Sequence, residues 1–429
     1  MSQTAVRLSV YLPIFFIGNL LFWADRTNFS VAAAVWAKQY GWTPAVLGAL
    51  LSAFSLGSML MQPFAGWIAD RAGPRRTVAT ASAVWSLWVL LTPFTVTVQP
   101  LLIAARALLG ISEAPYQPSM VVSVAKAFPE EHRRATPLAI FNSAGYVGPA
   151  LGVFLAAAIV GATKSAAMVF YIFAVAGFIF AGGWWLYARR HTDPAPSAEA
   201  AHTAEGQARA GNAPLPLRAL LLNWTLWPLF LGWAAGPYCQ FIFLTWLPQY
   251  LTKYHNLPVV QAGLLASVPF FAGAVMQFGS GFVLDWFAKR GWTGGWFAAY
   301  RKSTVYVGAL IFAIAIWIAA TTGSTSLAVI MITVGECGLA LYGCSFFVIV
   351  SDVAPNQAGL VFGLMNFFGA LAGFLSPLIS GIIAQRTGAF VAPLQVAVGV
   401  IVVGAVLTFF LRLRPLGEQS GRSPVPVPT

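Results

Sequence analysis

The chain of 429 residues is 59% hydrophobic and only 8% charged, whereas a soluble domain carries about a quarter charged residues. This composition excludes an ordinary soluble protein and indicates one that spans a membrane. The net charge of +12 would also fit a nucleic-acid-binding protein, so the positions of the basic residues must decide between the two.

Twelve apolar segments follow one another along the chain, and each is long enough for a helix that crosses about 30 Å of hydrocarbon. In chain order we expect them at residues 8–37, 43–69, 77–96, 98–127, 136–161, 166–188, 224–252, 258–287, 303–322, 326–351, 357–384 and 389–411. The sequence therefore predicts an all-α membrane protein with twelve transmembrane helices.

The basic residues are divided unequally between the two sides of this arrangement. With a cytoplasmic N-terminus, 18 of the 24 Lys and Arg residues lie on the cytoplasmic side and four on the other. Such a bias is the positive-inside signal of membrane proteins. We therefore expect both termini in the cytoplasm and no basic domain left to bind nucleic acid, while the Ala-rich composition and short loops favour a bacterial inner membrane.

The chain divides into two halves that resemble one another. We expect six-helix bundles at residues 1–188 and 224–412, a flexible cytoplasmic linker at 189–223 and a disordered tail at 413–429. An offset of 215 residues superimposes Met61 on Met276, Gln62 on Gln277, Gly66 on Gly281 and Asp70 on Asp285. Parallel repeats of this kind are typical of secondary transporters.

The loop after the second segment, "GWIADRAGPRR" at residues 66–76, combines a glycine, an acid and three bases. It resembles the signature loop of the major facilitator superfamily, which has the form G-x-x-x-D-R-x-G-x-[RK]-[RK]. The resemblance implies the pseudo-symmetric fold of that superfamily and a gating role at the interface between the halves for Gly66, Asp70, Arg71, Arg75 and Asp285. The alternative is a solvated basic turn without such a role.

Four charged residues lie well inside predicted spans of the first half, away from the span ends: Asp25 and Arg26 in "FWADRTNFS", and Arg106 and Glu113 in "RALLGISEAPYQP". A charge at mid-bilayer costs at least about 2.5–3.5 kcal/mol, so such residues point to function by default. Arg106 and Glu113 are seven residues apart and should share a helix face. A purely structural alternative pairs Asp25 with Arg26 and Arg106 with Glu113 as buried ion pairs.

Together "DRTNFS", "RALLGISEAP" and "SDVAPNQAG" resemble the anion:cation symporter family within that superfamily, which includes bacterial proton-coupled transporters of galactonate and glucarate. The resemblance implies that Asp25 and Glu113 titrate with the coupled protons. It also implies that Arg26 and Arg106 line the central cavity, with Arg106 on the substrate carboxylate. Further substrate contacts are implied for Asn142, Tyr238, Gln240, Trp246, Ser345 and Asn366.

Elementary chemistry agrees with these roles. The planar guanidinium fork of arginine matches a carboxylate, and a buried carboxyl exchanges its proton according to its neighbours. When a substrate anion occupies Arg106, Glu113 loses a favourable neighbour, and we expect it to bind a proton.

Three further features complete the sequence analysis. Glu336, in "TVGECGLALYG", is either an added proton or cation site or a hydrogen-bond partner of polar residues in the seventh helix. Gly369 and Gly373 form a G-x-x-x-G that we attribute to packing within one chain, so we expect a monomer. No nucleotide-binding motif or metal-type spacing of Cys and His occurs in the sequence, and we expect no cofactor.

The sequence thus predicts a secondary transporter that moves a small organic anion, a sugar acid or related carboxylate, together with protons by alternating access. It is not expected to be an enzyme. Two alternatives stay open: a carrier of the same fold for an aromatic or vitamin-like carboxylate, and a nontransporting membrane receptor or scaffold.

Overall fold

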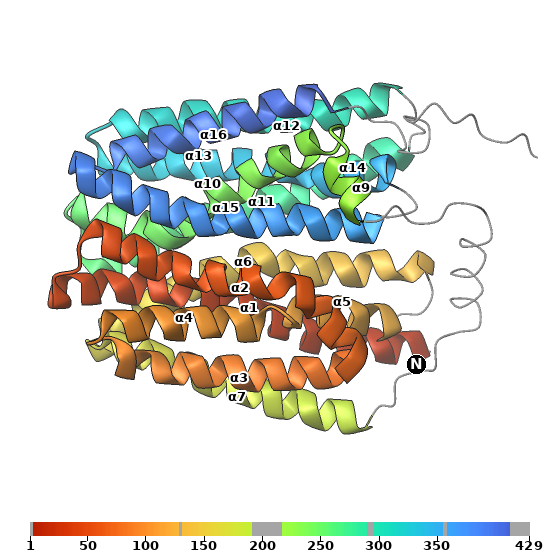
Figure 1. Ribbon diagram of the computed structural model, residues 1–429, viewed down its shortest axis with the longest axis horizontal. Coiled ribbons are helices and arrows are strands. Elements are labelled where there is room, and N and C mark those ends of the chain that lie inside the picture. Colours follow the sequence, from red (N-terminus) through yellow and green to blue (C-terminus); the bar gives the residue numbers. More distant parts are fainter. Residues whose placement is uncertain (1–2, 128–130, 191–216, 290–294, 355–357, 412–429) are drawn as a thin grey trace, which may run out of the picture.

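The computed structural model describes all residues except 1–2, 128–130, 191–216, 290–294, 355–357 and 412–429. The described chain folds into helices that run nearly parallel to one long axis (Figure 1). In the first half these are α1 (Gln3–Tyr40), α2 (Pro44–Ala72), α3 (Pro74–Thr95), α4 (Gln99–Glu113), α5 (Tyr116–Ala127), α6 (Glu131–Thr163) and α7 (Ala166–Arg190).

The second half contains α9 (Leu217–Leu222), α10 (Trp227–Lys253), α11 (Val259–Lys289), α12 (Gly295–Thr321), α13 (Thr325–Cys344), α14 (Phe346–Val353), α15 (Ala358–Thr387) and α16 (Val391–Phe409). The short α9 lies at the C-terminal end of the segment expected to be a linker, most of which lies outside the described residues.

Two of the twelve predicted segments are not continuous helices. The segment 98–127 divides into α4 and α5 next to Pro115, where proline lacks the N–H that would continue the helix and its ring clashes with the preceding turn. The segment 326–351 divides into α13 and α14 at Ser345, whose hydroxyl bonds to Thr304 Oγ1 on α12 at 2.6 Å. Each of these segments is thus a pair of helices, and the path of the chain is as expected.

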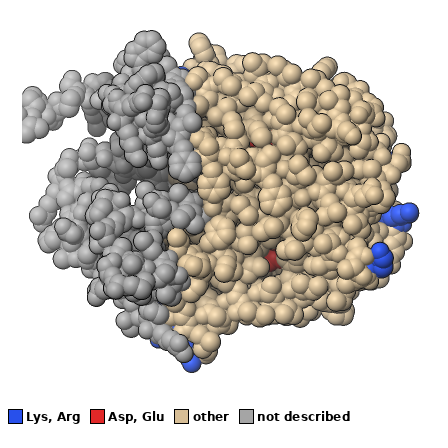
Figure 2. Space-filling view, turned by 180° about the vertical axis from the view of Figure 1, so that it is seen from behind, with Lys and Arg blue, Asp and Glu red and all other residues tan. Residues whose placement is uncertain are grey.

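Nine helices in the described part of the chain are long and apolar enough to cross a membrane: α2, α3, α6, α7, α11, α12, α13, α15 and α16. The other three predicted spans are α1, which carries Asp25 and Arg26, α4 with α5, and α10. In Figure 2 the described surface shows almost no charged side chains, and its Lys and Arg side chains lie near the rim. This surface suits a lipid environment.

The turns between helices follow local chemistry. Gly41 adopts φ +64° at the end of α1, a conformation that glycine reaches without penalty. Thr43 then caps α2, its hydroxyl accepting from the Val46 N–H at 3.4 Å, and Pro44 starts the helix. Gly73, with φ +85°, separates α2 from α3 in the same way.

The helices form two layers, with α1–α7 below and α10–α16 above in the view of Figure 1. The layers meet where α2 packs on α15 and α6 on α11. A Cβ at Gly48 would lie 2.7 Å from the Pro377 carbonyl oxygen and 3.0 Å from Gly381 Cα, so these backbones touch because neither helix has a side chain there. Gln385 Oε1 also accepts from the Ala45 N–H at 3.0 Å across the interface.

These contacts lie toward the end of the molecule at which α1 passes into α2, which we call the α1–α2 end. A second contact there joins α6 and α11, where Gly161 and Gly263 face Val260 and Ala157. The two halves are therefore closed against each other at the α1–α2 end.

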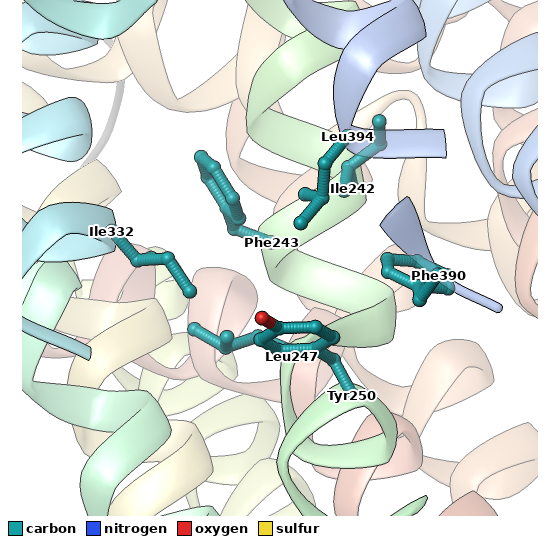
Figure 3. A pocket seen from close by; sticks show the side chains of 7 residues that line it. All are labelled: Ile242, Phe243, Leu247, Tyr250, Ile332, Phe390 and Leu394. Carbon is teal, nitrogen blue, oxygen red and sulfur yellow. The ribbon is translucent and has the colours of Figure 1, made fainter. Parts of the chain in front are cut away.

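The interior of the second half is tightly packed. Between α10, α13 and α16, the side chains drawn in Figure 3 surround a small apolar gap with no room for a water molecule. Gly369 and Gly373 on α15 lie against Trp233, Pro237 and Phe241 of α10. This G-x-x-x-G therefore serves packing within the chain, as the sequence analysis predicted.

Candidate functional site

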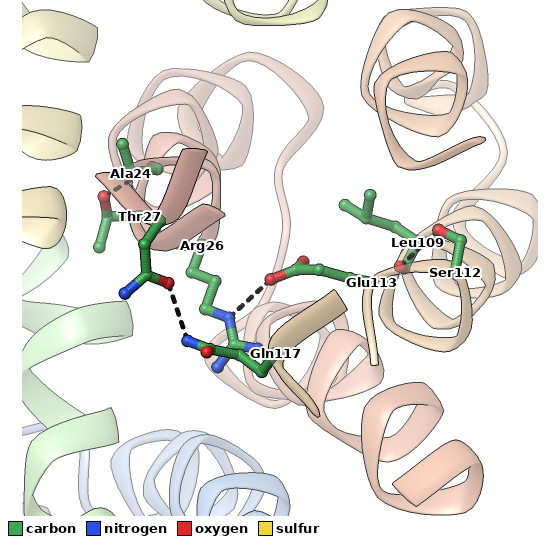
Figure 4. Close-up of polar contacts among 8 residues, drawn as sticks. Ala24, Arg26, Thr27, Leu109, Ser112, Glu113 and Gln117 are labelled. Carbon is green, nitrogen blue, oxygen red and sulfur yellow. Dashed lines mark hydrogen bonds and ion pairs between the residues drawn. The ribbon is translucent and has the colours of Figure 1, made fainter. Parts of the chain in front are cut away.

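A buried ion pair joins α1 to the end of α4. Arg26 Nε donates to Glu113 Oε1 at 2.8 Å, with side-chain exposures of 12% and 2% (Figure 4). The structural alternative had paired Asp25 with Arg26 and Arg106 with Glu113, each within one segment. This was wrong for Arg26 and Glu113, which pair with each other. Side chains of adjacent residues diverge by about 100° on a helix, so Arg26 turns away from Asp25 and meets the neighbouring helix.

Asp25 is buried beside this pair with 3% exposure. Its Oδ1 accepts from Asn28 Nδ2 at 3.0 Å, one helical turn along α1. Asn28 supplies a neutral donor rather than a positive charge. Asp25 is therefore held by a hydrogen bond that does not require it to be ionised.

Arg106 is buried on α4 with 2% exposure, and its Nε and NH1 have no hydrogen-bond partner among the described residues. As predicted, Arg106 and Glu113 share the buried face of α4. The guanidinium carbon lies 4.3 Å from the centre of the Phe29 ring and 5.4 Å from that of Phe54. Aromatic faces attract a cation, but they leave the N–H groups of Arg106 available for an anion.

The Phe54 ring lies close to both arginines, because Arg26 also approaches it, with its guanidinium carbon 5.2 Å from the ring centre. Phe54 reaches this position because α2 and α4 pack closely: a Cβ at Gly57 or Gly110 would collide with the facing backbone. Two glycines thus bring both guanidinium groups to one aromatic side chain.

A layer of aromatic rings, which begins on α1, lies next to the Arg26–Glu113 pair. Arg26 sits 4.3 Å above the Phe22 ring and 4.6 Å above that of Trp23. Phe22 stacks on Tyr116 with 4.9 Å between ring centres, and Trp85 meets Tyr116 edge-on at 4.9 Å. This layer excludes water from one side of the charged centre, which strengthens the electrostatic interactions within it.

The sequence analysis missed a polar link between α1, α5 and α6. Gln117 Nε2 donates to Asn19 Oδ1 at 2.9 Å, and Asn19 Nδ2 donates to the Phe141 carbonyl at 2.6 Å. Figure 4 draws this hydrogen bond of Gln117 in the same view as the Arg26–Glu113 pair. A signal was present in the sequence, since Asn19 precedes Arg26 by seven residues and so shares its helix face.

Several predicted residues fall where side chains are not described. Gly66 and Asp70 lie in α2, Asn142 in α6 and Asp285 in α11, but their side chains lie outside the described residues. Arg71 is exposed with its guanidinium carbon 5.5 Å from the centre of the Trp67 ring. Arg75 lies 5.7 Å from the Tyr187 ring of α7. Both described arginines thus contact aromatic rings of the first half.

In the second half, the predicted site residue Gln240 forms a hydrogen bond with Glu336 of α13. Gln240 Nε2, on α10, donates to Glu336 Oε1 at 2.7 Å. The hydrogen bond expected between Glu336 and the seventh helix is therefore present.

The other residues implied on the substrate path are placed mainly within the packing of this half. Tyr238 and Trp246 are buried on α10, and the Trp246 indole N–H donates to the Pro377 carbonyl at 3.3 Å. Ser345 is fully buried at the break between α13 and α14, and Asn366 is half-buried on α15. The structure thus gathers the arginines with Asp25 and Glu113 but places these four residues in the opposite half.

No group of three His, Cys, Asp or Glu residues in the described ranges is arranged to hold a metal ion. A groove of about 430 Å³ lies between α12 and α16 and is lined by apolar side chains such as Leu310, Val402 and Phe409. It lies among exposed hydrophobic residues of the outer surface, so it offers no polar group to a charged ligand. The charged centre of the first half is the candidate site.

Comparison with known proteins places the chain in a family. The family model of the Major Facilitator Superfamily matches residues 15–377. The D-galactonate transporter of Escherichia coli O6:H1 is 31% identical over 425 residues, covering 94% of this chain and 95% of the relative. The "Probable L-galactonate transporter" of Escherichia coli (strain K12) is 28% identical over 424 residues, covering 96% and 91%.

A "Probable galactarate/D-glucarate transporter" of Escherichia coli (strain K12) is 31% identical over 408 residues, covering 89% of both chains. Among solved structures, a bacterial homolog of the human lysosomal transporter Spinster, inward-facing and occupied, matches with a TM-score of 0.74, 18% identity and coverage of 94% and 96%. The D-xylose-proton symporter matches with a TM-score of 0.71, 15% identity and coverage of 94% and 97%. The chain is an integral membrane transporter that belongs to the major facilitator superfamily.

Proposed function

We propose that this transporter carries a small organic anion, a sugar acid or related carboxylate, together with protons by alternating access. One observation carries the proposal: Arg106 is 2% exposed, and its Nε and NH1 have no hydrogen-bond partner within the described chain. Buried N–H groups without a hydrogen bond are unfavourable, and a substrate carboxylate would satisfy them with charge-assisted hydrogen bonds. The relatives named as galactonate transporters support a sugar acid as that substrate.

Proton coupling follows from the partner of Arg26. While Glu113 is ionised, it occupies Arg26 at 2.8 Å. Protonation of Glu113 removes the negative charge and releases Arg26, so that both guanidinium groups beside Phe54 can face one carboxylate. Binding of the anion and of the proton therefore favour each other, which is the requirement for symport. Asp25, held by neutral Asn28, is the second carboxyl available for a proton.

The distribution of basic residues supports an orientation with both termini in the cytoplasm, in a bacterial inner membrane. The α1–α2 end would then face outward. Because the halves touch there through Gly48 and Gly381, we infer that the structure represents a state closed to the outside. Monomeric function is consistent with the placement of Gly369 and Gly373 against α10 of the same chain.

The test is uptake of radiolabelled D-galactonate into liposomes that contain the purified protein. We expect accumulation when the external pH is lower than the internal pH, and no accumulation when an ionophore collapses the gradient. Arg106→Gln should abolish uptake, whereas Thr333→Val, at a site in the other half, should not. Uptake that ignores the proton gradient would refute symport, and no binding or uptake of any carboxylate would favour a nontransporting receptor.

A further inference from the structure

The second half contains a buried acid that the proposed coupling does not use. Glu336 lies on α13 with 0% exposure, eleven residues after the start of the helix at Thr325, which is about 16 Å along the helix axis. Its Oε1 accepts from Gln240 Nε2 at 2.7 Å, and its Oε2 is buried without a hydrogen-bond partner among the described residues. The described chain therefore offers this carboxyl a neutral amide.

The described part of the second half places no positive charge within ion-pair distance of Glu336. Its described basic residues lie at or near the ends of helices or apolar spans: Arg218, Lys253, Lys302 and Arg386. An ionised carboxylate in such a place loses its water and gains no cation in return. The surroundings therefore favour the neutral, protonated form of the carboxyl.

The titratable neighbours of Glu336 do not change this balance. They are the phenol of Tyr146 on α6 and the thiols of Cys239 on α10 and Cys337 on α13. Phenols and thiols are largely neutral at pH 7. Helix α11 meets the acid with Gly273, and α12 places Ile316 against the adjacent Gly335, so these described contacts bring no charge to it.

Glu336 also lies at the contact between the two halves. A Cβ at Gly273, on α11, would lie 3.0 Å from Glu336 Cγ, 3.6 Å from Glu336 Oε1 and 3.5 Å from Tyr146 Cδ1. Tyr146 belongs to α6 in the first half. The acid and the tyrosine therefore approach one another where Gly273 has no side chain, and the first half helps to cover the carboxyl.

This contact continues the one that closes the α1–α2 end. On α6, Tyr146 precedes Gly161 by fifteen residues, and on α11, Gly273 follows Val260 by thirteen, so both lie about 20 Å deeper along the same two helices. Opening of the halves toward the α1–α2 end must separate α6 from α11. Separation would bring water to a carboxyl that is dry in the closed state, and water favours the ionised form.

We propose that Glu336 is a proton-binding site of the second half and that its proton stabilises the state closed to the outside. The carboxyl takes up a proton when α6 and α11 come together and releases it when they separate. Because it is 0% exposed in the closed state, its proton comes from the outer side and returns there. The site therefore responds to the external pH and adds no proton to those that Asp25 and Glu113 would carry. The inference rests on the alternating access of the proposed function, but on neither Arg106 nor the substrate.

The test measures the separation of α6 and α11 without substrate. Spin labels are attached to cysteines placed at Thr163 and Gln261, which are exposed at the α1–α2 ends of the two helices, in full-length protein without its native cysteines. Distances between the labels are recorded in lipid nanodiscs by pulsed electron paramagnetic resonance from pH 5.5 to pH 8.5. One proton linked to closure changes the ratio of open to closed molecules by up to about tenfold per pH unit. We expect the open population of the wild type to grow as the pH rises.

Glu336→Gln keeps the shape of the side chain but cannot ionise. We expect this variant to stay closed at high pH, with an open-to-closed ratio at pH 8.5 about tenfold or more below that of the wild type, and to match the wild type at pH 5.5. Any pH dependence left in the variant belongs to Asp25 and Glu113. Thr333→Val, one turn away on α13, is the matched control and should follow the wild type.

Two results would overturn the inference. One is an equal open population of the wild type and Glu336→Gln at pH 8.5, including the case in which neither opens. The other is a population that follows the Na⁺ concentration at constant pH and ionic strength, which would assign the acid to a metal cation.

Binding of D-galactonate separates this failure from failure of the proposed function. At pH 5.5, where both proteins are closed, Glu336→Gln should bind D-galactonate as tightly as the wild type, and a large loss of affinity would place Glu336 in the substrate site instead. Absence of binding by the wild type to any carboxylate would refute the proposed substrate class, while the distances would still decide for or against the proton site.

Discussion

Arg26 Nε donates to Glu113 Oε1 at 2.8 Å, across two helices that are separated by 87 residues of chain. From the sequence, Arg26 could instead have paired with Asp25, and Glu113 with Arg106, each within one segment. The observed contact also changes the coupling hypothesis. The basic neighbour that Glu113 gains or loses is Arg26 rather than Arg106, and Arg106 keeps N–H groups that can bind an anion.

Breaking the pair from one side should destabilise the protein. Glu113→Gln leaves the Arg26 charge buried without its counter-ion, and removing one partner of a buried pair costs about 3–5 kcal/mol. We expect a clearly lower Tm in detergent, and the double variant Arg26→Met, Glu113→Gln should recover much of the loss. A double variant that is as unstable as the sum of both single variants would show that the two residues do not interact.

Arg106 should behave in the opposite way. Because its Nε and NH1 bond to no described protein group, Arg106→Gln is expected to keep or raise the Tm of the ligand-free protein. The same variant should lose the Tm increase that millimolar D-galactonate gives to the wild type through mass action. A large fall in the ligand-free Tm would indicate that Arg106 is part of the packing instead.

Gly48 should control which end of the transporter is open. In Gly48→Ala, the new Cβ would lie 2.7 Å from the Pro377 carbonyl oxygen, so the halves must separate at the α1–α2 end. We expect faster thiol labelling of a cysteine placed at Ser52, one turn deeper on α2, in protein that lacks the three native cysteines.

Gly182→Ala is the matched control for this experiment, because a Cβ there meets nothing within 4 Å. It should leave the labelling rate unchanged. Equal rates in the wild type and Gly48→Ala would contradict a closed contact at this glycine.

His255 gives a prediction for pH. It lies in the loop between α10 and α11, where its ring contacts Tyr250 Oη at 2.9 Å and Thr325 Oγ1 at 3.1 Å, and burial lowers its pKa below the ordinary 6.5. The unfolded chain therefore binds more protons than the folded one as the pH falls through that range, and stability is lost on the acid side.

The measurement compares the Tm of the wild type and His255→Gln from pH 7.5 to pH 5. The advantage of the wild type should be constant above about pH 6.5 and shrink below it. The change should be small, since the ring is half-buried. A difference that grows on acidification would mean that the folded state favours the charged ring.

The sequence alone determined the all-helical membrane architecture, the course of the chain through twelve segments and the four charges of the first half. Helix length and apolar composition are local properties, and a bilayer leaves few alternatives for an apolar segment of this length. The signature loop at residues 66–76 and the intramembrane charges were sufficient to identify the superfamily.

Only the tertiary structure decided which charges meet. Seven-residue spacing placed Arg106 and Glu113 on one face of α4, but the partner of Glu113 came from α1, because helix packing rather than sequence distance selects contacts. The same holds for Gln240 with Glu336 and for Gly48 with Gly381. Each joins segments about a hundred residues or more apart, and their contacts depend on how whole helices lie against one another.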